Sequence, residues 1–339
     1  MTTSAPHFAV IGGGIRGRGY AAAIQQNRDA ELVAVCDPSP EVRTALAADL
    51  GVPVHPDTAS LLAAHPEVTA AVVATPDAAH LVPVTACLDR GLDLLIEKPL
   101  ATDLAEARTM AEAVRRAGVR TMVAFENRWN PKFQSVLADV RSTDGQVVNQ
   151  VVNLNDTIFV PTRMLSWAAA STPGWFLFPH SLDLATWLGG SRPVEVVARG
   201  VRRHLPALGI DTWDAISATF TMADGSLVTL NSQWVLPEAM PAVFDFRYEL
   251  NTTAAAYRIE ISDSGVTRYG GTGVTALHAP ERDLHGRQTG LIATMTDDFI
   301  DLLNGAELEL PDVEQGLLIT AAIDAVHQSL ADGQAHPIA

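Results

Sequence analysis

The sequence predicts an α/β protein in two parts: an N-terminal doubly wound parallel sheet, then an α+β domain whose open-faced sheet is predominantly antiparallel. Over the first 125 residues, short β-branched runs alternate with longer alanine-rich segments of helical period. This alternation is typical of parallel strands joined by right-handed helical crossovers. From about Val147, strand-like runs follow one another with short turns, which favours antiparallel pairing. We therefore expect one domain over residues 1–125 and another over residues 126–339.

The expected strands of the first domain are continuous apolar runs, so helices should cover both faces of its sheet. These strands lie at residues 8–11, 32–35, 70–74, 94–96 and 121–124. The clearest helical segment between them covers residues 105–117.

The expected strands of the second domain alternate apolar and polar residues, so one face of its sheet should be packed. Asp224-Gly225 is a hairpin signal between two of them. The strands are expected at residues 147–154, 194–201, 215–222, 227–235, 243–250 and 257–261, and helices at residues 180–188, 289–303 and 314–330. Because the helices can cover only one side, we expect an uncovered apolar face through which a homodimer or homotetramer forms.

Composition argues against several kinds of partner. The chain carries 23 Lys plus Arg against 39 Asp plus Glu, a formal charge of −16, so neither nucleic acid nor a membrane surface is expected to bind it. Cys36 and Cys87 both sit in apolar stretches without metal-ligand spacing, which predicts reduced core cysteines, no metal site and a cytoplasmic location. The N-terminal residues show no export signal.

The segment Gly12-Gly13-Gly14-Ile15-Arg16-Gly17 is a G-x-G-x-x-G motif directly after the first expected strand. Glycines there let the backbone approach a pyrophosphate, and the start of the next helix adds positive dipole. The second expected strand ends at Asp37, where an acid would meet the adenosine ribose. This context predicts a Rossmann dinucleotide-binding domain rather than a mere tight turn. Asp37 favours NAD over NADP because it repels a 2′-phosphate, although Arg16, Arg18 and Arg43 are cations nearby.

Three further segments should lie at the same edge of the first sheet. They are ATPDAAH at residues 74–80, EKP at residues 97–99 and FENRWNP at residues 125–131. Each follows an expected parallel strand, and ligands bind outside the carboxyl ends of such strands. All three segments are therefore candidates for lining the cofactor site.

Together these motifs make the sequence closely resemble the Gfo/Idh/MocA family of oxidoreductases. The resemblance rests on AVIGGGIRG, ATPDAAH, EKPLA and ENRWNP, and on PHSLDLATWLGG in the second domain, and it extends over the whole chain. The glycine motif and EKP are specific in combination, whereas either alone is not. The cofactor-binding residues implied by motif and resemblance are Gly12, Gly14, Ile15, Arg16, Gly17, Asp37, Thr75, Pro76, His80, Glu97, Lys98, Asn127 and Arg128. For His80, a helix-start role without ligand contact is an equally good interpretation.

Lys98 is the expected proton-transfer residue. Partial burial and the positive charge of oxidised nicotinamide both disfavour its ammonium form, so it can act as a general base while hydride leaves the same substrate carbon. Glu97 should orient Lys98, and the resemblance implies a cis peptide bond before Pro99.

In the second domain, His180 is the expected polar partner of the reacting oxygen. Pro179 suits the first turn of a helix, which would place His180 at the helix N-terminus and Asp183 one turn on, on the same face. In the family pattern an aspartate usually stands four positions before this histidine, but here Phe176 stands there. The departure predicts a less polar pocket in which Asp183 is the remaining carboxylate. Arg163 is the next candidate for binding substrate.

The sequence therefore predicts a cytoplasmic, NAD-dependent oxidoreductase acting on a secondary alcohol or ketone of a sugar, cyclitol or related polyol. The alternative is a noncatalytic NAD-sensing regulator on the same scaffold, because a fold does not fix a function. Lys98 and His180 favour the enzyme, and Phe176 favours the regulator.

Overall fold

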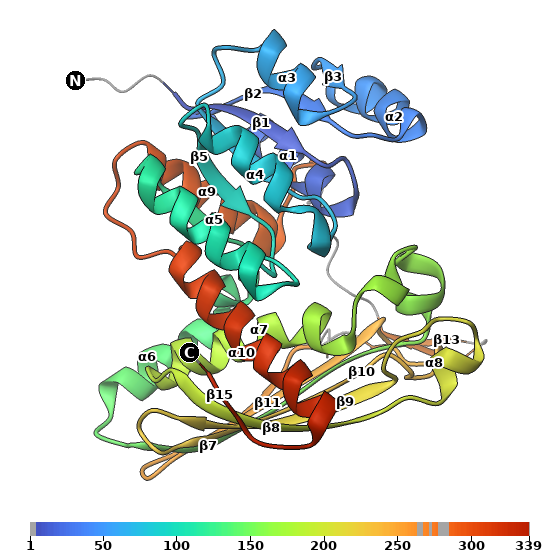
Figure 1. Ribbon diagram of the computed structural model, residues 1–339, viewed down its shortest axis with the longest axis vertical. Helices are drawn as coiled ribbons and strands as arrows, with labels where there is room; N and C mark the ends of the chain where they lie inside the picture. Colours follow the sequence, from blue (N-terminus) through green and yellow to red (C-terminus); the bar gives the residue numbers. More distant parts are fainter. Residues whose placement is uncertain (1–4, 263–266, 271–272, 277–284, 339) are drawn as a thin grey trace. The chain divides into compact units, whose positions relative to one another are not determined.

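The computed structural model describes residues 5–262, 267–270, 273–276 and 285–338 (Figure 1). The chain forms two compact units: Met1–Trp129 with Pro280–Thr320, and Asn130–Ala279 with Ala321–Ala339. This division differs from the single boundary at residues 125 and 126 that the sequence suggested. The reason is that α9 (Gly290–Leu303) and the N-terminal part of α10 (Val313–Asp332) belong to the first unit, although they follow the second unit's strands in sequence.

The first unit contains a six-stranded parallel sheet of order β3-β2-β1-β4-β5-β6. Its strands are β1 (His7–Ile11), β2 (Glu31–Cys36), β3 (Val54–His55), β4 (Ala70–Val73), β5 (Asp93–Ile96) and β6 (Thr121–Val123). The sequence predicted all of them except β3, which is only two residues long. The strand order reverses between β1 and β4, and this is the switch point beside which doubly wound sheets bind ligands.

Helices cover both faces of this sheet, which explains why its strands are apolar throughout. One layer holds α1 (Ile15–Gln26), α2 (Pro40–Leu50) and α9 (Gly290–Leu303); the other holds α3 (Thr58–Ala64), α4 (Leu81–Leu88) and α5 (Leu104–Ala117).

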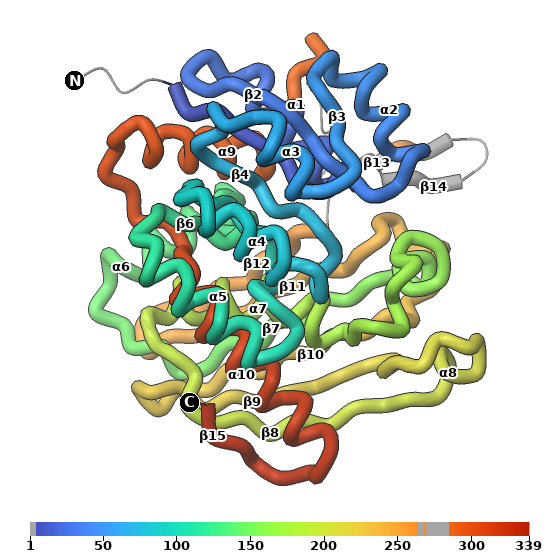
Figure 2. The backbone as a smooth tube through the Cα atoms, turned by 45° about the horizontal axis from the view of Figure 1, so that its top comes forward, coloured from blue at the N-terminus to red at the C-terminus, as the bar shows by residue number. Residues whose placement is uncertain are grey.

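Helix α9 belongs to the first unit because its apolar face is needed to complete that unit's core. Phe299 of α9 packs edge-on against Phe8 of β1, with ring centroids 6.2 Å apart. Asp298 accepts a hydrogen bond from the indole N–H of Trp129 at 2.7 Å. The α9 helix therefore packs beside α1 and against Phe8 of β1, although nearly 280 residues separate α9 from β1 in sequence; Figure 2 shows α9 within the first unit.

The second unit contains a seven-stranded sheet of order β12-β11-β7-β10-β9-β8-β15, in which only β7 and β10 pair in parallel. Its strands are β7 (Val147–Asp156), β8 (Pro193–Val201), β9 (Ala215–Met222), β10 (Leu227–Gln233), β11 (Phe244–Thr252), β12 (Ala256–Glu260) and β15 (His336–Pro337). The helices are α6 (Pro131–Ser142), α7 (Pro173–Gly189), the short α8 (His204–Ala207) and the C-terminal part of α10 (Val313–Asp332). Two short strands, β13 (Thr267–Gly270) and β14 (Gly273–Ala276), form a separate hairpin.

The two faces of the second sheet differ in chemistry. Helix α7 packs on β7, β9 and β10, against buried residues such as Val152, Phe220 and Leu230 (Figure 1). On the opposite face, alternate positions carry polar side chains that bond across strands: the Ser217 hydroxyl donates to Asn231 (2.8 Å), and the Asn231 amide donates to Asn153 (3.2 Å).

Within the described part of the chain this face is therefore uncovered but mixed in chemistry, not the continuous apolar face that the sequence suggested. Several outward positions hold asparagine, serine and threonine, which bond across strands while remaining partly exposed, and others hold apolar residues such as Val151, Val197 and Leu227.

Among the described residues, no helix is both long enough and apolar enough to span a membrane.

Candidate active site

The glycine loop between β1 and α1 has the close contacts that only glycine permits. A Cβ on Gly12, whose φ is +100°, would lie 2.4 Å from the carbonyl oxygen of Ala74, and one on Gly17 would lie 1.8 Å from that of Gly12. A Cβ on Gly14 would meet nothing within 4 Å. Gly12 and Gly17 are thus required by the turn itself. Gly14 and the exposed Ile15 instead present open backbone at the start of α1. An open backbone at a helix N-terminus fits a dinucleotide pyrophosphate.

Asp37 is held rigidly at the end of β2. Its carboxylate accepts from the backbone N–H of Gly13 (2.8 Å) and of Ser39 (2.9 Å). The acid thereby fixes the glycine loop from the side where the adenosine ribose of a dinucleotide would lie. Two nearby arginines are engaged within the unit: Arg43 donates to the carbonyl oxygens of Asp37 and Pro38, and Arg18 pairs with Asp49 at 2.7 Å.

The three polar segments leave the sheet side by side, as predicted. In the register of the sheet, Val73 of β4 is opposite Ile96 of β5, and Ile96 is opposite Val123 of β6. The next residues extend the ladder, since Glu97 N–H donates to the Val73 carbonyl (2.9 Å) and Ala124 N–H to the Ile96 carbonyl (2.8 Å). Lys98, 8% exposed, follows at once, and its peptide bond to Pro99 is cis, which confirms the expectation.

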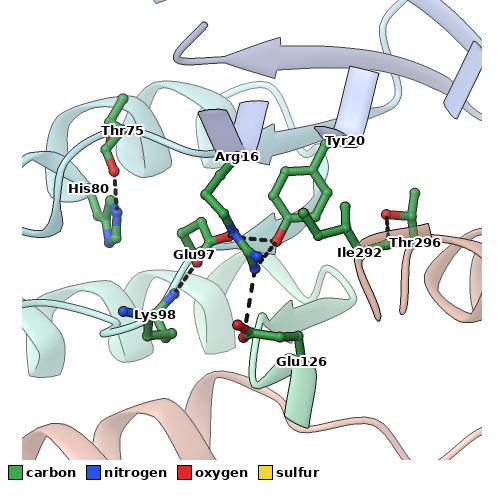
Figure 3. A network of polar contacts seen from close by, with 9 residues as sticks. All are labelled: Arg16, Tyr20, Thr75, His80, Glu97, Lys98, Glu126, Ile292 and Thr296. Atoms are coloured by element: carbon green, nitrogen blue, oxygen red, sulfur yellow. Dashed lines mark hydrogen bonds and ion pairs between the residues drawn. The ribbon is translucent and has the colours of Figure 1, made fainter. Parts of the chain in front are cut away.

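Figure 3 shows an ion network around Glu97, which is 5% exposed. Its carboxylate accepts from Arg16 Nε at 2.5 Å and from the Tyr20 hydroxyl at 2.7 Å. The Arg16 guanidinium lies 3.6 Å from the carboxylate of Glu126, in the 3₁₀ turn Glu126–Trp129 that also carries Asn127 and Arg128. Arg16 thus points to Glu97 in this structure rather than outward from the glycine loop.

The ATPDAAH segment is tied to the EKP segment by His80. The imidazole is 1% exposed; its Nδ1 lies 2.9 Å from the carbonyl oxygen of Pro99, and its Nε2 lies 3.1 Å from that of Thr75. Both ring nitrogens face main-chain carbonyls. Of the two interpretations left open by the sequence, the geometry favours the structural one, in which His80 joins two loops. Thr75 and Pro76 stand beside it, with the Thr75 hydroxyl donating to Ala79 at 3.0 Å.

Tyr20, Glu126 and Asp77 are site residues that the sequence did not reveal. Tyr20 lies one helical turn after Arg16, a spacing that places both on one face of α1 and could have indicated the pair. Asp77 is 7% exposed, and among the described residues its Oδ2 has no hydrogen-bond partner. Burial raises the pKa of Asp77, whereas the charges of Lys98 and His80 lower it.

In the second unit, helix α7 carries His180 and Asp183 three residues apart on one face. The helix begins seven residues earlier than the sequence suggested. Thr172 caps it by accepting from the Trp175 N–H (3.0 Å), and Pro173 occupies the first helical position, so Pro179 lies inside the helix. His180 is therefore two turns from the N-terminus, and its position gives it no direct contact with the positive end of the helix dipole.

Asp183 is a buried carboxylate, 1% exposed, close to Tyr248 of β11. Burial raises the pKa of Tyr248 well above its ordinary value, and the charge of Asp183 raises it further. The Tyr248 hydroxyl donates to the side chain of Gln150, whose amide donates to the Ala185 carbonyl at 3.0 Å. This chain of contacts fixes α7 to the sheet two residues after Asp183.

Phe176, which replaces the usual aspartate, packs between two tryptophans. Its ring centroid lies 6.0 Å from that of Trp167 and 5.7 Å from that of Trp234, both edge-to-face. Arg163 pairs with Glu238 and lies over the ring of Phe159, so its charge is compensated in this structure.

Two features bear on metals and thiols. Among the described residues, no group of three or more His, Cys, Asp or Glu side chains could hold a metal ion. Burial raises the pKa of Cys36 to about 11 and that of Cys87 to about 12, so both are inert core thiols.

The strand order, the glycine loop and the acid at the end of β2 together define a dinucleotide-binding unit. Residues 7–125 match the model of an oxidoreductase family with an NAD-binding Rossmann fold, and residues 139–258 match the GFO/IDH/MocA C-terminal domain. The chain belongs to the Gfo/Idh/MocA family of oxidoreductases, whose cofactor is a nicotinamide dinucleotide.

Relatives match over nearly the full length. Inositol 2-dehydrogenase of Rhizobium meliloti (strain 1021) is 26% identical over 96% of this chain and 97% of its own. D-glucoside 3-dehydrogenase of Escherichia coli (strain K12) is 24% identical over 98% of this chain and 97% of its own. The crystal structure of a putative myo-inositol dehydrogenase from Sinorhizobium meliloti 1021 superposes with a TM-score of 0.82 at 25% identity, covering 98% of this chain and 100% of the other.

Proposed function

We propose that this protein is an NAD-dependent oxidoreductase that transfers hydride between nicotinamide and a secondary alcohol or ketone of a sugar, cyclitol or related polyol. The observation that carries the proposal is Lys98, a nearly buried lysine at the carboxyl end of β5, in the sheet that also carries the glycine loop. The relatives reported above are dehydrogenases of a cyclitol and of a glucoside, which favours the enzyme over the noncatalytic regulator.

In the proposed oxidation, the carbon–hydrogen bond of the substrate breaks and both of its electrons leave with the hydrogen as hydride. The bound dinucleotide supplies the hydride acceptor. The hydroxyl proton passes to the neutral amine of Lys98, and the carbon–oxygen bond becomes a carbonyl. In the reverse direction, the Lys98 ammonium returns the proton.

His180 and Asp183 are proposed substrate ligands. We assign His180 to the reacting oxygen, as hydrogen-bond partner, and Asp183 to a substrate hydroxyl. Arg163 stays a weaker candidate, because binding substrate would require its ion pair with Glu238 to open.

Cofactor contacts are proposed for the open backbone of Gly14, Ile15 and Arg16, with Gly12 and Gly17 shaping the loop. On the neighbouring segments we propose contacts for Thr75, Pro76, Glu97, Lys98, Asn127 and Arg128. Asp37 supports NAD over NADP, because two backbone N–H groups hold its carboxylate in place to meet a 2′-hydroxyl.

We further propose a cytoplasmic homodimer or homotetramer that associates through the second sheet. The supporting observation is the uncovered face of β7, β9, β10 and β11, which combines hydrogen-bonding and apolar side chains, as protein–protein interfaces do.

A substrate panel tests the function. The purified full-length chain is incubated with NAD and each of a set of inositols, pentoses, hexoses and glucosides, and NADH is followed by absorbance. We expect turnover with at least one cyclitol or sugar and a higher rate with NAD than with NADP. Binding of NAD by calorimetry without turnover of any compound, in either direction, would support the regulator instead.

A further inference from the structure

An ion network joins the first turn of α1 to the strand end that carries Lys98 (Figure 3). Glu97 Oε1 accepts from both Arg16 (2.5 Å) and Tyr20 (2.7 Å), while Oε2 accepts from the backbone N–H of Lys98 (3.2 Å). Both oxygens are thus used, and one of them holds the main chain of the proposed base. We propose that Arg16 and Tyr20 are positioning residues for Lys98 that act through Glu97; this inference rests on the proposed function.

The burial of Glu97 explains why it needs these partners. A carboxylate removed from water is stable as an ion only when it is paired and hydrogen-bonded. Burial by itself lowers the pKa of Arg16, but the charges of Glu97, Tyr20 and Glu126 and the hydrogen bond to Glu97 raise it well above its ordinary value. Arg16 therefore stays a cation next to Glu97 at every pH at which the enzyme would work.

Tyr20 supports the same ion pair from a second side. Burial raises its pKa well above the ordinary value, an effect that Arg16 opposes and Glu97 reinforces. The side chain therefore remains a phenol and donates to Glu97. Its ring also lies under the Arg16 guanidinium, 5.6 Å from carbon to ring centroid, which is a cation–π contact.

The network also pairs the carboxylate that precedes Lys98 in the chain with a cation. An uncompensated carboxylate beside an amine stabilises the ammonium form, whereas a general base must be present as the neutral amine. Arg16 offsets the Glu97 charge, so removing Arg16 should change the electrostatic environment of Lys98. The sequence listed Arg16 among the cofactor-binding residues; its side chain pairs with Glu97, while its backbone stays a proposed cofactor contact.

Other titratable groups of the first unit lie near the Arg16–Glu97 ion pair. Glu126 lies 3.6 Å from Arg16, and the buried Asp77 and His80 come from the segment after β4. Asp77 acts in the same sense as Glu97, since the charges of Lys98 and His80 lower its pKa. These groups are identical in all the variants compared, so differences between variants isolate Arg16 and Glu97.

The chain allows a direct test because its sequence contains only two lysines, Lys98 and Lys132. Labelling with ¹³C-lysine therefore yields one side-chain signal from the proposed base and one internal reference. We expect Arg16→Met to move the titration midpoint of Lys98 upward by about one pH unit, because it leaves the Glu97 carboxylate uncompensated. Glu97→Gln should move it downward by about as much, and the double variant should return it close to that of the unmodified chain.

Arg18→Met is the matched control. Arg18 lies on the same helix two residues from Arg16, but it pairs with the exposed Asp49. Its loss should leave the Lys98 midpoint unchanged. Tyr20→Phe removes only the hydroxyl donor and should lower kcat about fivefold with little change in KM, because it loosens Glu97 without changing the net charge.

The readouts separate this inference from the proposed function. Midpoint shifts are measured without turnover, so they test the network even if the substrate panel fails. If Arg16→Met does not fold, Glu97→Gln and the double variant carry the test, and both keep Lys98 and Lys132 as the only labelled residues. Single variants that shift Lys98 in the same direction, or by no more than Arg18→Met does, would overturn the inference.

Discussion

The two units use polar side chains in opposite ways. At the strand ends of the first unit, Glu97, His80 and Asp77 are nearly buried, and they face charged groups or main-chain carbonyls. On the uncovered face of the second sheet, Asn153, Asn231 and their neighbours are half-exposed and exchange neutral hydrogen bonds in rows. A polar residue that alternates along a strand marks a face of a sheet, whereas one that ends an apolar strand marks a site. Breaking a contact on the face of the second sheet should therefore have a small effect on stability or function. Breaking one at the strand ends of the first unit should have a large effect.

The largest expected effect lies in the glycine loop. Gly17→Ala places a Cβ 1.8 Å from the Gly12 carbonyl oxygen and should destabilise the first unit by about 3 kcal/mol or more, because backbone must move. Gly14→Ala meets nothing within 4 Å, so its thermal unfolding should match that of the unmodified chain while its affinity for NAD falls about tenfold. Thermal melts and calorimetry measure the two effects. Equal melting temperatures for both variants would contradict the assignment of the loop.

Asp37→Ala should change cofactor preference more than stability. Removing the carboxylate removes the partner of the ribose 2′-hydroxyl and the repulsion of a 2′-phosphate. We expect NAD to bind about tenfold more weakly and NADP to bind no worse than before, as measured by calorimetric titration of each. Asp49→Ala, which removes another acid of the first unit, is the control. Tighter binding of NADP than of NAD by the unmodified chain would refute the proposed preference.

The second unit should show its own pH dependence through His327 of α10. Burial lowers the pKa of this imidazole, although hydrogen bonding to the Ile323 carbonyl and the charge of Asp324 oppose the shift. Nδ1 faces the Ile323 carbonyl at 2.8 Å, Nε2 contacts the Thr172 hydroxyl at 2.8 Å, and the ring stacks on Trp175. In the unfolded chain His327 takes up a proton near pH 6.5, whereas in the folded chain it does so only at lower pH. The free energy of unfolding should therefore fall as pH drops below about 6.5, down to the lower pKa of the folded state.

This contribution has a slope of at most about 1.4 kcal/mol per pH unit. His327→Gln should remove it, so the difference in unfolding free energy between the two proteins should shrink from pH 7.5 to pH 5.5. Chemical denaturation at both values measures it. A difference that grows on acidification would mean that His327 is protonated in the folded state.

The smallest expected effect is on the uncovered face. Asn231→Ala breaks contacts to Ser217 and Asn153 but leaves no buried charge without a partner, so it should lower the free energy of unfolding by about 1 kcal/mol or less.

The same face should nonetheless hold the oligomer together, and Thr229→Arg in its centre should dissociate it. Light scattering at micromolar concentration tests this. A monomeric unmodified chain would refute the proposed interface.

Local patterns predicted most of the fold and the edge of the sheet where polar groups gather. The strands, the Asp224-Gly225 turn and the alignment of residues 74–80, 97–99 and 125–131 all follow from short-range rules of burial and parallel pairing. The packing of α9 on β1 did not follow, because an apolar helix face does not specify which sheet it will cover. The start of α7 was misplaced because two prolines, Pro173 and Pro179, both suit a first turn; the capping hydroxyl of Thr172 decides between them. The pairing of Arg16 with Glu97 did not follow from local patterns either, because the two residues lie 81 positions apart in sequence.

The central claim is that Lys98 transfers the proton while hydride moves to NAD. The most direct measurement is a single-turnover rate of NADH formation, with a substrate found in the panel, for the unmodified chain, Lys98→Met and Lys132→Met. We predict that Lys98→Met lowers this rate about a thousandfold with NAD affinity within about threefold, because general-base contributions are typically of this size. Lys132→Met, which removes the other lysine, should react at the normal rate. A Lys98→Met rate within tenfold of the unmodified chain would contradict the account.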